Sequence, residues 1–202
     1  SLAGKLNRSP VADICSDGAS IVPILKYSSC HLLAISYLSD MLNNLKNKDV
    51  MDYLKIEDGI LLSCDKNVEG VLVIPDHVRI IDSCAFASCT KLRVVVMPDF
   101  LWGIKECAFS ECTSLESVVF GSYLGYIGDY AFSECTSLKH IYIPATVWRI
   151  GKWVFGKCDS LESIVVDSRN LVYDSREGCN AIIDTFYDTL VMGCKTSVIP
   201  ST

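Results

Sequence analysis

A repeat of 23 residues runs through the middle of this 202-residue chain and constrains its fold more than any other feature. Phenylalanines keep this interval at Phe86, Phe109, Phe132 and Phe155. Three further positions keep the same phase, one with cysteine, one with leucine and one with isoleucine: Cys89, Cys112, Cys135, Cys158; Leu92, Leu115, Leu138, Leu161; Ile81, Ile104, Ile127, Ile150. One such unit is too short to bury its own apolar face, so we expect the units to stack into a solenoid with a shared core.

Each unit is predicted to hold a strand followed by a turn. Leu138, Ile141 and Ile143 alternate into the end of the unit as residues of a half-buried strand do, and Pro144 then ends the strand. Val147 and Ile150 predict a second, shorter extended piece. The recurring Ala-Phe-x-x-Cys segment is predicted to form a short helical or irregular turn on the other side of the coil.

This combination resembles the BspA-like, or Treponema pallidum-type, leucine-rich repeats. The resemblance covers about Ile56–Thr202 and depends on the Leu-x-x-Ile-x-Ile-Pro strand and the Ala-Phe-x-x-Cys turn recurring together. It implies a right-handed leucine-rich-repeat coil with a parallel β-sheet on its concave face. It also implies a bacterial surface or secreted protein that binds other proteins, host components included.

The flanks of the repeat block are predicted to contain hairpins. The segment 57–64 leads through a turn to 71–75 and is interpreted as a β-hairpin that enters the first repeat. Repeats are predicted over about 69–167, and a hairpin-type segment over 168–202, with strands near Cys179–Ile183 and Thr189–Cys194. The repeat domain is thus expected to span residues 56–202.

Residues 1–55 do not repeat. Five apolar residues there follow helical spacing: Leu32, Ile35, Leu38, Leu42 and Leu45. We interpret this region as an N-terminal helical cap over the apolar end of the solenoid, the alternative being a separate small helical domain. A short second helix is predicted from Asp49 through Leu54. Polar interruptions in the apolar stretch 21–38 argue against a membrane span, and no signal peptide is recognisable.

The chain has 11 cysteines, an odd number, so at least one thiol has no partner within the chain. Six of them lie on 23-residue steps, because Cys84 and Cys107 add a second step to the four named above. Buried thiols, disulfides and a zinc site built on Cys84-x4-Cys89 and Cys107-x4-Cys112 are the three interpretations. Buried thiols are favoured, because free cysteine is among the most buried residue types. Whether Cys179 and Cys194 pair is left open.

Neither catalysis nor nucleic-acid binding is indicated. There are three histidines, none within a recognisable nucleophile, zinc-protease, phosphate-loop or dinucleotide motif. With a net charge of −6, the chain also lacks the excess of basic residues that nucleic-acid binding requires. We therefore predict a non-catalytic protein with no cofactor and no metal site, the alternative class being a thiol- or metal-dependent enzyme.

Residues between the inward positions of the predicted strands are expected to face the concave surface. They form an apolar stripe of Val96, Val119, Tyr142 and Val165. The candidate binding residues are the aromatic and histidine side chains of this surface and of the second extended piece: Trp102, Tyr126, His140, Tyr142 and Trp148. The alternative is that the valines only suit a strand and that the tryptophans fill grooves between units.

The sequence thus predicts an interaction scaffold that binds a protein ligand, or a glycan, through its repeat surface. The alternative function is a structural spacer within a longer surface protein. The surface or secreted location follows from the family resemblance alone.

Overall fold

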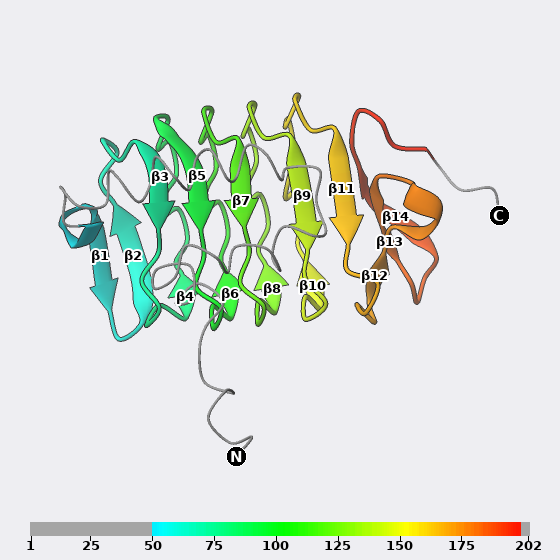
Figure 1. Cartoon of the computed structure of the whole chain (residues 1–202), viewed down its shortest axis with the longest axis horizontal. Coiled ribbons are helices and arrows are strands. Elements are labelled where there is room, and N and C mark those ends of the chain that lie inside the picture. Colours follow the sequence, from blue (N-terminus) through cyan, green and yellow to red (C-terminus); the bar gives the residue numbers. More distant parts are fainter. Residues whose placement is uncertain (1–49, 199–202) are drawn as a thin grey trace, which may run out of the picture. The chain divides into compact units, whose positions relative to one another are not determined.

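The computed structural model describes residues 50–198, which all belong to a compact unit spanning residues 47–202. Two sheets run along a coil in this unit (Figure 1). The five-stranded sheet contains β3 (Gly70–Val73), β5 (Leu92–Val96), β7 (Ser117–Val119), β9 (His140–Ile143) and β11 (Ser163–Val166). The six-stranded sheet contains β1 (Leu54–Glu57), β2 (Ile60–Cys64), β4 (Ile80–Ile81), β6 (Gly103–Ile104), β8 (Tyr126–Ile127) and β10 (Arg149–Ile150).

A smaller antiparallel sheet follows the coil. It contains β12 (Tyr173–Asp174), β13 (Ala181–Asp184) and β14 (Thr189–Gly193). β13 and β14 pair as neighbours, which confirms the hairpin predicted in this segment. Two short 3₁₀ turns, η3 (Val50–Tyr53) and η4 (Arg176–Gly178), complete the described chain.

The repeat period is the length of one turn of the coil. In the five-stranded sheet Ser163 lies beside His140, and in the six-stranded sheet Ile104 lies beside Ile81, each pair 23 residues apart and parallel. The predicted solenoid with parallel strands is therefore confirmed.

The entry into the coil differs from the prediction. β1 and β2 form the hairpin, and its turn is Asp58-Gly59, where both residues have positive φ angles of 49° and 74°. β2 then pairs with β4, and β3 pairs with β5, so the hairpin predicted between segments 57–64 and 71–75 is wrong. The strands of a solenoid pair across turns of the coil, and a local hairpin interpretation misses that pairing.

Most of the predicted N-terminal cap precedes the first described residue, Val50. Its main helix, Leu32–Leu45, lies outside the described residues. At the predicted second helix, the described residues form the 3₁₀ turn η3, and Leu54 already begins β1. No α-helix occurs within residues 50–198. The division of the chain at residue 55 stays a prediction.

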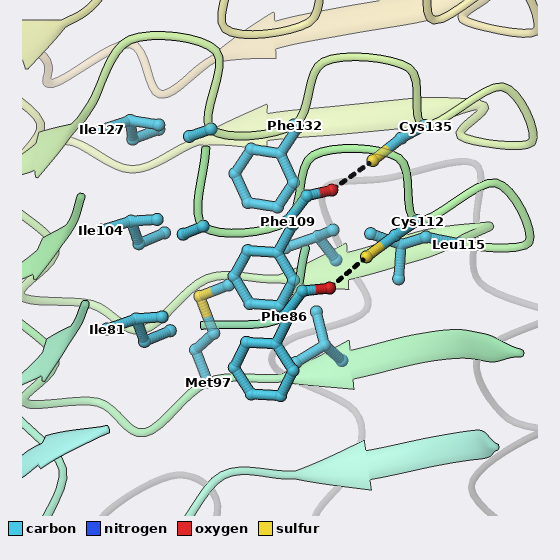
Figure 2. Close-up of a cluster of buried hydrophobic side chains, with 14 of the residues drawn as sticks. Ile81, Phe86, Met97, Ile104, Phe109, Cys112, Leu115, Ile127, Phe132 and Cys135 are labelled. Atoms are coloured by element: carbon cyan, nitrogen blue, oxygen red, sulfur yellow. Dashed lines mark hydrogen bonds between the residues drawn. The ribbon is translucent and has the colours of Figure 1, made fainter. Parts of the chain in front are cut away.

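The core of the coil is a continuous stack of phenylalanine rings (Figure 2). Phe109 lies between Phe86 and Phe132, with ring centroids 4.6 and 5.0 Å away and planes within 5° of parallel. Phe155 extends the stack beyond Phe132 at 5.6 Å. Phe86, Phe109 and Phe132 are inaccessible to solvent. Each turn of the coil thus contributes one ring to a core that no single turn could form.

Beside the rings runs a cysteine column: Cys89, Cys112, Cys135 and Cys158. The first three thiols are inaccessible, and Cys158 is 9% exposed. The Sγ of Cys112 donates to the carbonyl of Phe86 at 3.2 Å, and Cys135 repeats this bond to Phe109 (Figure 2). The buried-thiol prediction is confirmed for this column, because each sulfur fills space in the core. Cys112, Cys135 and Cys158 also each donate to a carbonyl of the preceding turn.

The Ala-Phe-x-x-Cys segments form irregular turns that contain two left-handed residues per coil turn. One left-handed position holds Cys84, Cys107, Tyr130 and Trp153, and we call it the outward slot; the other holds Ser88, Glu111, Glu134 and Lys157. Left-handed φ angles are incompatible with a continuing α-helix. Hydrogen bonds between turns hold the conformation, as when the Phe86 amide donates to the Ala108 carbonyl at 2.7 Å.

Candidate binding surface

Trp102 and Trp148 lie immediately before β6 and β10, two strands of the six-stranded sheet (Figure 1). They occupy equivalent positions two turns apart, and Gly125 occupies the position between them. The exposed fractions of the two tryptophans are 53% and 51%. Both side chains are therefore half-exposed, and their role as binding residues stays a prediction.

The two indole rings lean toward each other over Gly125. A Cβ atom built on Gly125 would lie 2.9 Å from Nε1 of Trp148 and 3.4 Å from Nε1 of Trp102. Glycine thus leaves room for the two indole nitrogens beside its Cα. Within residues 50–198 neither indole N–H donates a hydrogen bond.

Tyr126 supports this arrangement from the neighbouring position. Its ring lies over Gly103, where an added Cβ would be 2.0 Å from a ring carbon. It meets the Trp102 ring edge-on, with centroids 5.3 Å apart and planes at 83°. Tyr126 is half-buried, so it fixes Trp102 as well as adding contact area.

Two aromatic residues close to these in the sequence were not predicted as binding residues. Phe100 and Tyr123 stack with centroids 4.9 Å apart, and they are 51% and 58% exposed. The Arg79 guanidinium lies 5.7 Å from the Phe100 ring centroid, within cation–π range. Tyr123 follows Phe100 by 23 residues, and this interval is the sequence signal that the prediction missed. We call Phe100, Trp102, Tyr123, Tyr126 and Trp148 the aromatic surface.

His140 and Tyr142 do not belong to the aromatic surface, because both lie on β9 in the other sheet. The Tyr142 hydroxyl donates to Oδ2 of Asp167 at 2.7 Å. The Arg169 guanidinium, together with this hydroxyl, holds the pKa of Asp167 well below its usual range. Through its bond to Asp167, Tyr142 therefore links neighbouring parts of the coil. His140 is half-buried, and its Nδ1 has no hydrogen-bond partner within the described residues.

The predicted apolar stripe is exposed at one end only. Val165 on β11 is 38% exposed, but Val96 on β5 is 8% exposed and its neighbour Val94 is 7% exposed. Neither Val94 nor Val96 belongs to the core cluster inside the coil. The stripe is therefore not a continuous accessible surface, and the prediction is wrong at β5.

The cysteines differ in their exposure to solvent according to their position in the coil. All nine cysteines of the described region are free thiols, Cys179 and Cys194 among them. Cys84 is exposed whereas Cys89 is inaccessible, so the zinc site proposed from their spacing does not form. Within residues 50–198 no three His, Cys, Asp or Glu side chains gather as metal ligands. Burial raises the pKa of Cys112 and of Cys158 to about 12, which makes these thiols unreactive.

A coil of stacked 23-residue turns with parallel sheets along it defines the class of leucine-rich-repeat solenoids. A family model described as the BspA type leucine rich repeat region matches residues 55–180 in six copies. The chain belongs to this family. No curated protein matches the chain.

Several solved bacterial structures are similar to this chain. The pneumococcal vaccine antigen PcpA is 23% identical with a TM-score of 0.51, over 58% of this chain and 31% of PcpA. The T. pallidum leucine rich repeat protein TpLRR is 23% identical with a TM-score of 0.47, over 56% and 68% of the two chains. A leucine-rich repeat protein from Bacteroides ovatus is 39% identical with a TM-score of 0.44, over 46% of this chain and 24% of that protein. The match with PcpA supports the fold. No helix in the described part of the chain is long and apolar enough to cross a bilayer.

Proposed function

We propose that this protein is a non-catalytic interaction scaffold, displayed on a bacterial surface or secreted, that binds a protein ligand through the aromatic surface. The observation that carries the proposal is the pair of half-exposed tryptophans whose indole nitrogens both lie over Gly125, without a hydrogen-bond partner in the described chain. Exposed aromatic groups of this size are uncommon on surfaces that contact only water.

The geometry suits a protein ligand in two ways. Indole and phenol rings supply a large contact area at a low cost in conformational entropy, which is why tryptophan and tyrosine are enriched at binding hot spots. The two indole N–H groups are hydrogen-bond donors, and every protein partner offers backbone carbonyls as acceptors. The coil fixes the spacing between these groups, because Trp102 and Trp148 are each followed by a strand of the same parallel sheet.

The test compares three single variants of the full chain. Trp102→Ala and Trp148→Ala each remove one donor and one ring from the aromatic surface. Trp153→Ala is the matched control, because Trp153 is even more exposed, at 66%, but occupies the outward slot. Far-UV circular dichroism checks that each variant retains its fold.

Binding is measured on arrays of purified extracellular proteins and of glycans, followed by titration of any hit by surface plasmon resonance. We expect a protein hit whose dissociation constant rises about 30-fold in each aromatic-surface variant, since a hot-spot residue contributes about 2 kcal/mol. The control variant should bind as the unmodified chain does. Unchanged binding by Trp102→Ala and Trp148→Ala would reject this surface, and hits confined to glycans would reject the protein ligand.

A further inference from the structure

Six of the nine described thiols are buried, and the accessible ones are Cys84, Cys107 and Cys194. Cys84 and Cys107 occupy the outward slot on consecutive turns of the coil. They are thus the one pair of cysteines in the described chain that is repeat-related and reachable from solvent. The proposed function gives them no role.

The backbone places these two residues in equivalent environments. Their φ angles are 58° and 54°, and both amides donate to the next turn, from Cys84 to the Glu106 carbonyl at 3.1 Å and from Cys107 to the Asp129 carbonyl at 3.0 Å. The parallel pairing of Ile81 with Ile104 fixes the register three residues earlier. Equivalent backbones in register direct the two Cα–Cβ bonds the same way, about 4.7–4.9 Å apart, the spacing of neighbouring strands.

The surroundings of Cys107 act on its thiol. Burial raises the pKa of Cys107, and the neighbouring Cys84 raises it further. The carboxylates of Glu106 and Asp129 act on Cys107 in the same direction, so the site carries negative charge nearby. A negative potential favours the binding of a cation.

This spacing is unfavourable for a disulfide and favourable for a bridging ion. A disulfide requires the Cβ atoms to approach to about 3.5–4.5 Å with the two side chains turned toward each other. A zinc–thiolate bond measures about 2.3 Å, and two thiolates in line across one first-row ion of similar size would stand about 4.6 Å apart. Soft thiolate ligands select Cu(I), and a two-coordinate ion needs no further ligand.

We propose that Cys84 and Cys107 form a surface site for one soft monovalent cation of the Cu(I) kind, held between two thiolates. Binding releases two protons from the thiols to the solvent and changes no oxidation state. Zn(II) is excluded as the bound ion, because it requires four ligands and no group of three or more His, Cys, Asp or Glu side chains gathers as metal ligands within residues 50–198. Tyr130 follows Cys107 in the outward slot, and both line a hollow of about 380 Å³ that is open to solvent.

The experiment titrates the reduced, full-length protein with Cu(I) under anaerobic conditions against a chromophoric Cu(I) chelator. Cys84→Ser and Cys107→Ser are compared with Cys194→Ser, a partly exposed thiol outside the repeat. Because other cysteines can also take up Cu(I), the readout is the difference between variants. We expect Cys84→Ser and Cys107→Ser each to weaken the binding of one equivalent by about 100-fold or more, and Cys194→Ser to retain it.

Two further measurements complete the test. One equivalent of Cu(I) should protect Cys84 and Cys107 from alkylation, as followed by peptide mass spectrometry, whereas Zn(II) at the same concentration should not. X-ray absorption should show two sulfur neighbours around the copper. Equal Cu(I) affinity in all three variants, or equal protection by Zn(II), would overturn the proposal. Because none of these measurements involves a protein ligand, their outcome is independent of the proposed function.

Discussion

Replacing Phe109 by alanine tests whether the ring stack holds the coil together. Phe109 is inaccessible to solvent and is the ring with a near-parallel neighbour on each side, Phe86 at 4.6 Å and Phe132 at 5.0 Å. Truncation of a buried phenylalanine to alanine costs about 3–5 kcal/mol. Each aromatic contact contributes about 0.5–1.5 kcal/mol to such a loss, and Phe109 loses two of them. We therefore expect a decrease of about 4–5 kcal/mol in the free energy of unfolding.

The matched control is Phe155→Ala at the end of the stack. Phe155 is 3% exposed and has one ring neighbour, Phe132, at 5.6 Å with planes at 19°. Its truncation should cost about 1 kcal/mol less than that of Phe109, by the value of one ring contact. Equilibrium unfolding in urea, followed by far-UV circular dichroism, measures both variants.

A milder variant covers the case in which Phe109→Ala does not fold. Phe109→Leu keeps most of the volume but loses both ring contacts, so we expect a cost of about 1–2 kcal/mol. The reasoning is refuted if Phe109→Ala costs less than about 1.5 kcal/mol, or if Phe155→Ala costs more than Phe109→Ala. Either result would mean that the neighbouring turns do not depend on the shared stack.

Three further predictions concern other parts of the coil. In the native protein at pH 8, iodoacetamide should label Cys84 and leave Cys112 and Cys135 unlabelled until urea is added, because burial raises the pKa of both buried thiols; peptide mass spectrometry reads the pattern. Gly121→Ala should cost about 2 kcal/mol or more in a urea titration, because its Cβ would lie 2.0 Å from the Pro98 carbonyl oxygen. Gly125→Ala should cost about 1 kcal/mol and shift the tryptophan fluorescence, because the nearest atom is the movable Nε1 of Trp148 at 2.9 Å and the Trp102 carbonyl oxygen lies 3.3 Å away. Asp167→Asn should lower stability by about 1–2 kcal/mol at pH 7. Because the folded pKa of Asp167 lies below its usual value, its contribution is present above that value and is lost as pH falls below about 4, so thermal unfolding of the unmodified chain should weaken there more steeply than that of the variant.

The sequence period predicts which residues share a position on successive turns, and this part of the fold is confirmed. Phe86, Phe109 and Phe132 are in phase in the sequence and in contact in the structure. The same reasoning failed where the chain enters the coil, because the period begins only after β2. There the Asp58-Gly59 pair marks the turn of a hairpin, and its two strands lie directly on either side of it.

The candidate site was predicted only in part, for a physical reason. Periodicity places Trp102 and Trp148 in one position on the coil, but it does not give the side-chain rotamers that bring both indoles over Gly125. Alternation along β5 predicts correctly that Val96 points away from the core cluster, yet it says nothing about accessibility, and Val96 is buried. The direction of a side chain follows from the backbone of its strand, whereas its exposed fraction depends on every residue that packs against it.

The two sets of cysteines show how one repeat supports both structure and chemistry. The cysteine column occupies a position enclosed by neighbouring turns, where the side chain must be small, and three of its four thiols donate to a carbonyl, as Cys112 does to Phe86. The outward slot imposes a left-handed backbone but no limit on size, and it accommodates Cys84 on one turn and Trp153 on another. Side chains in the outward slot can therefore differ from turn to turn without disturbing the core. In such a coil new chemistry is expected at outward positions, and Cys84 with Cys107 is the place where two turns present the same reactive group side by side.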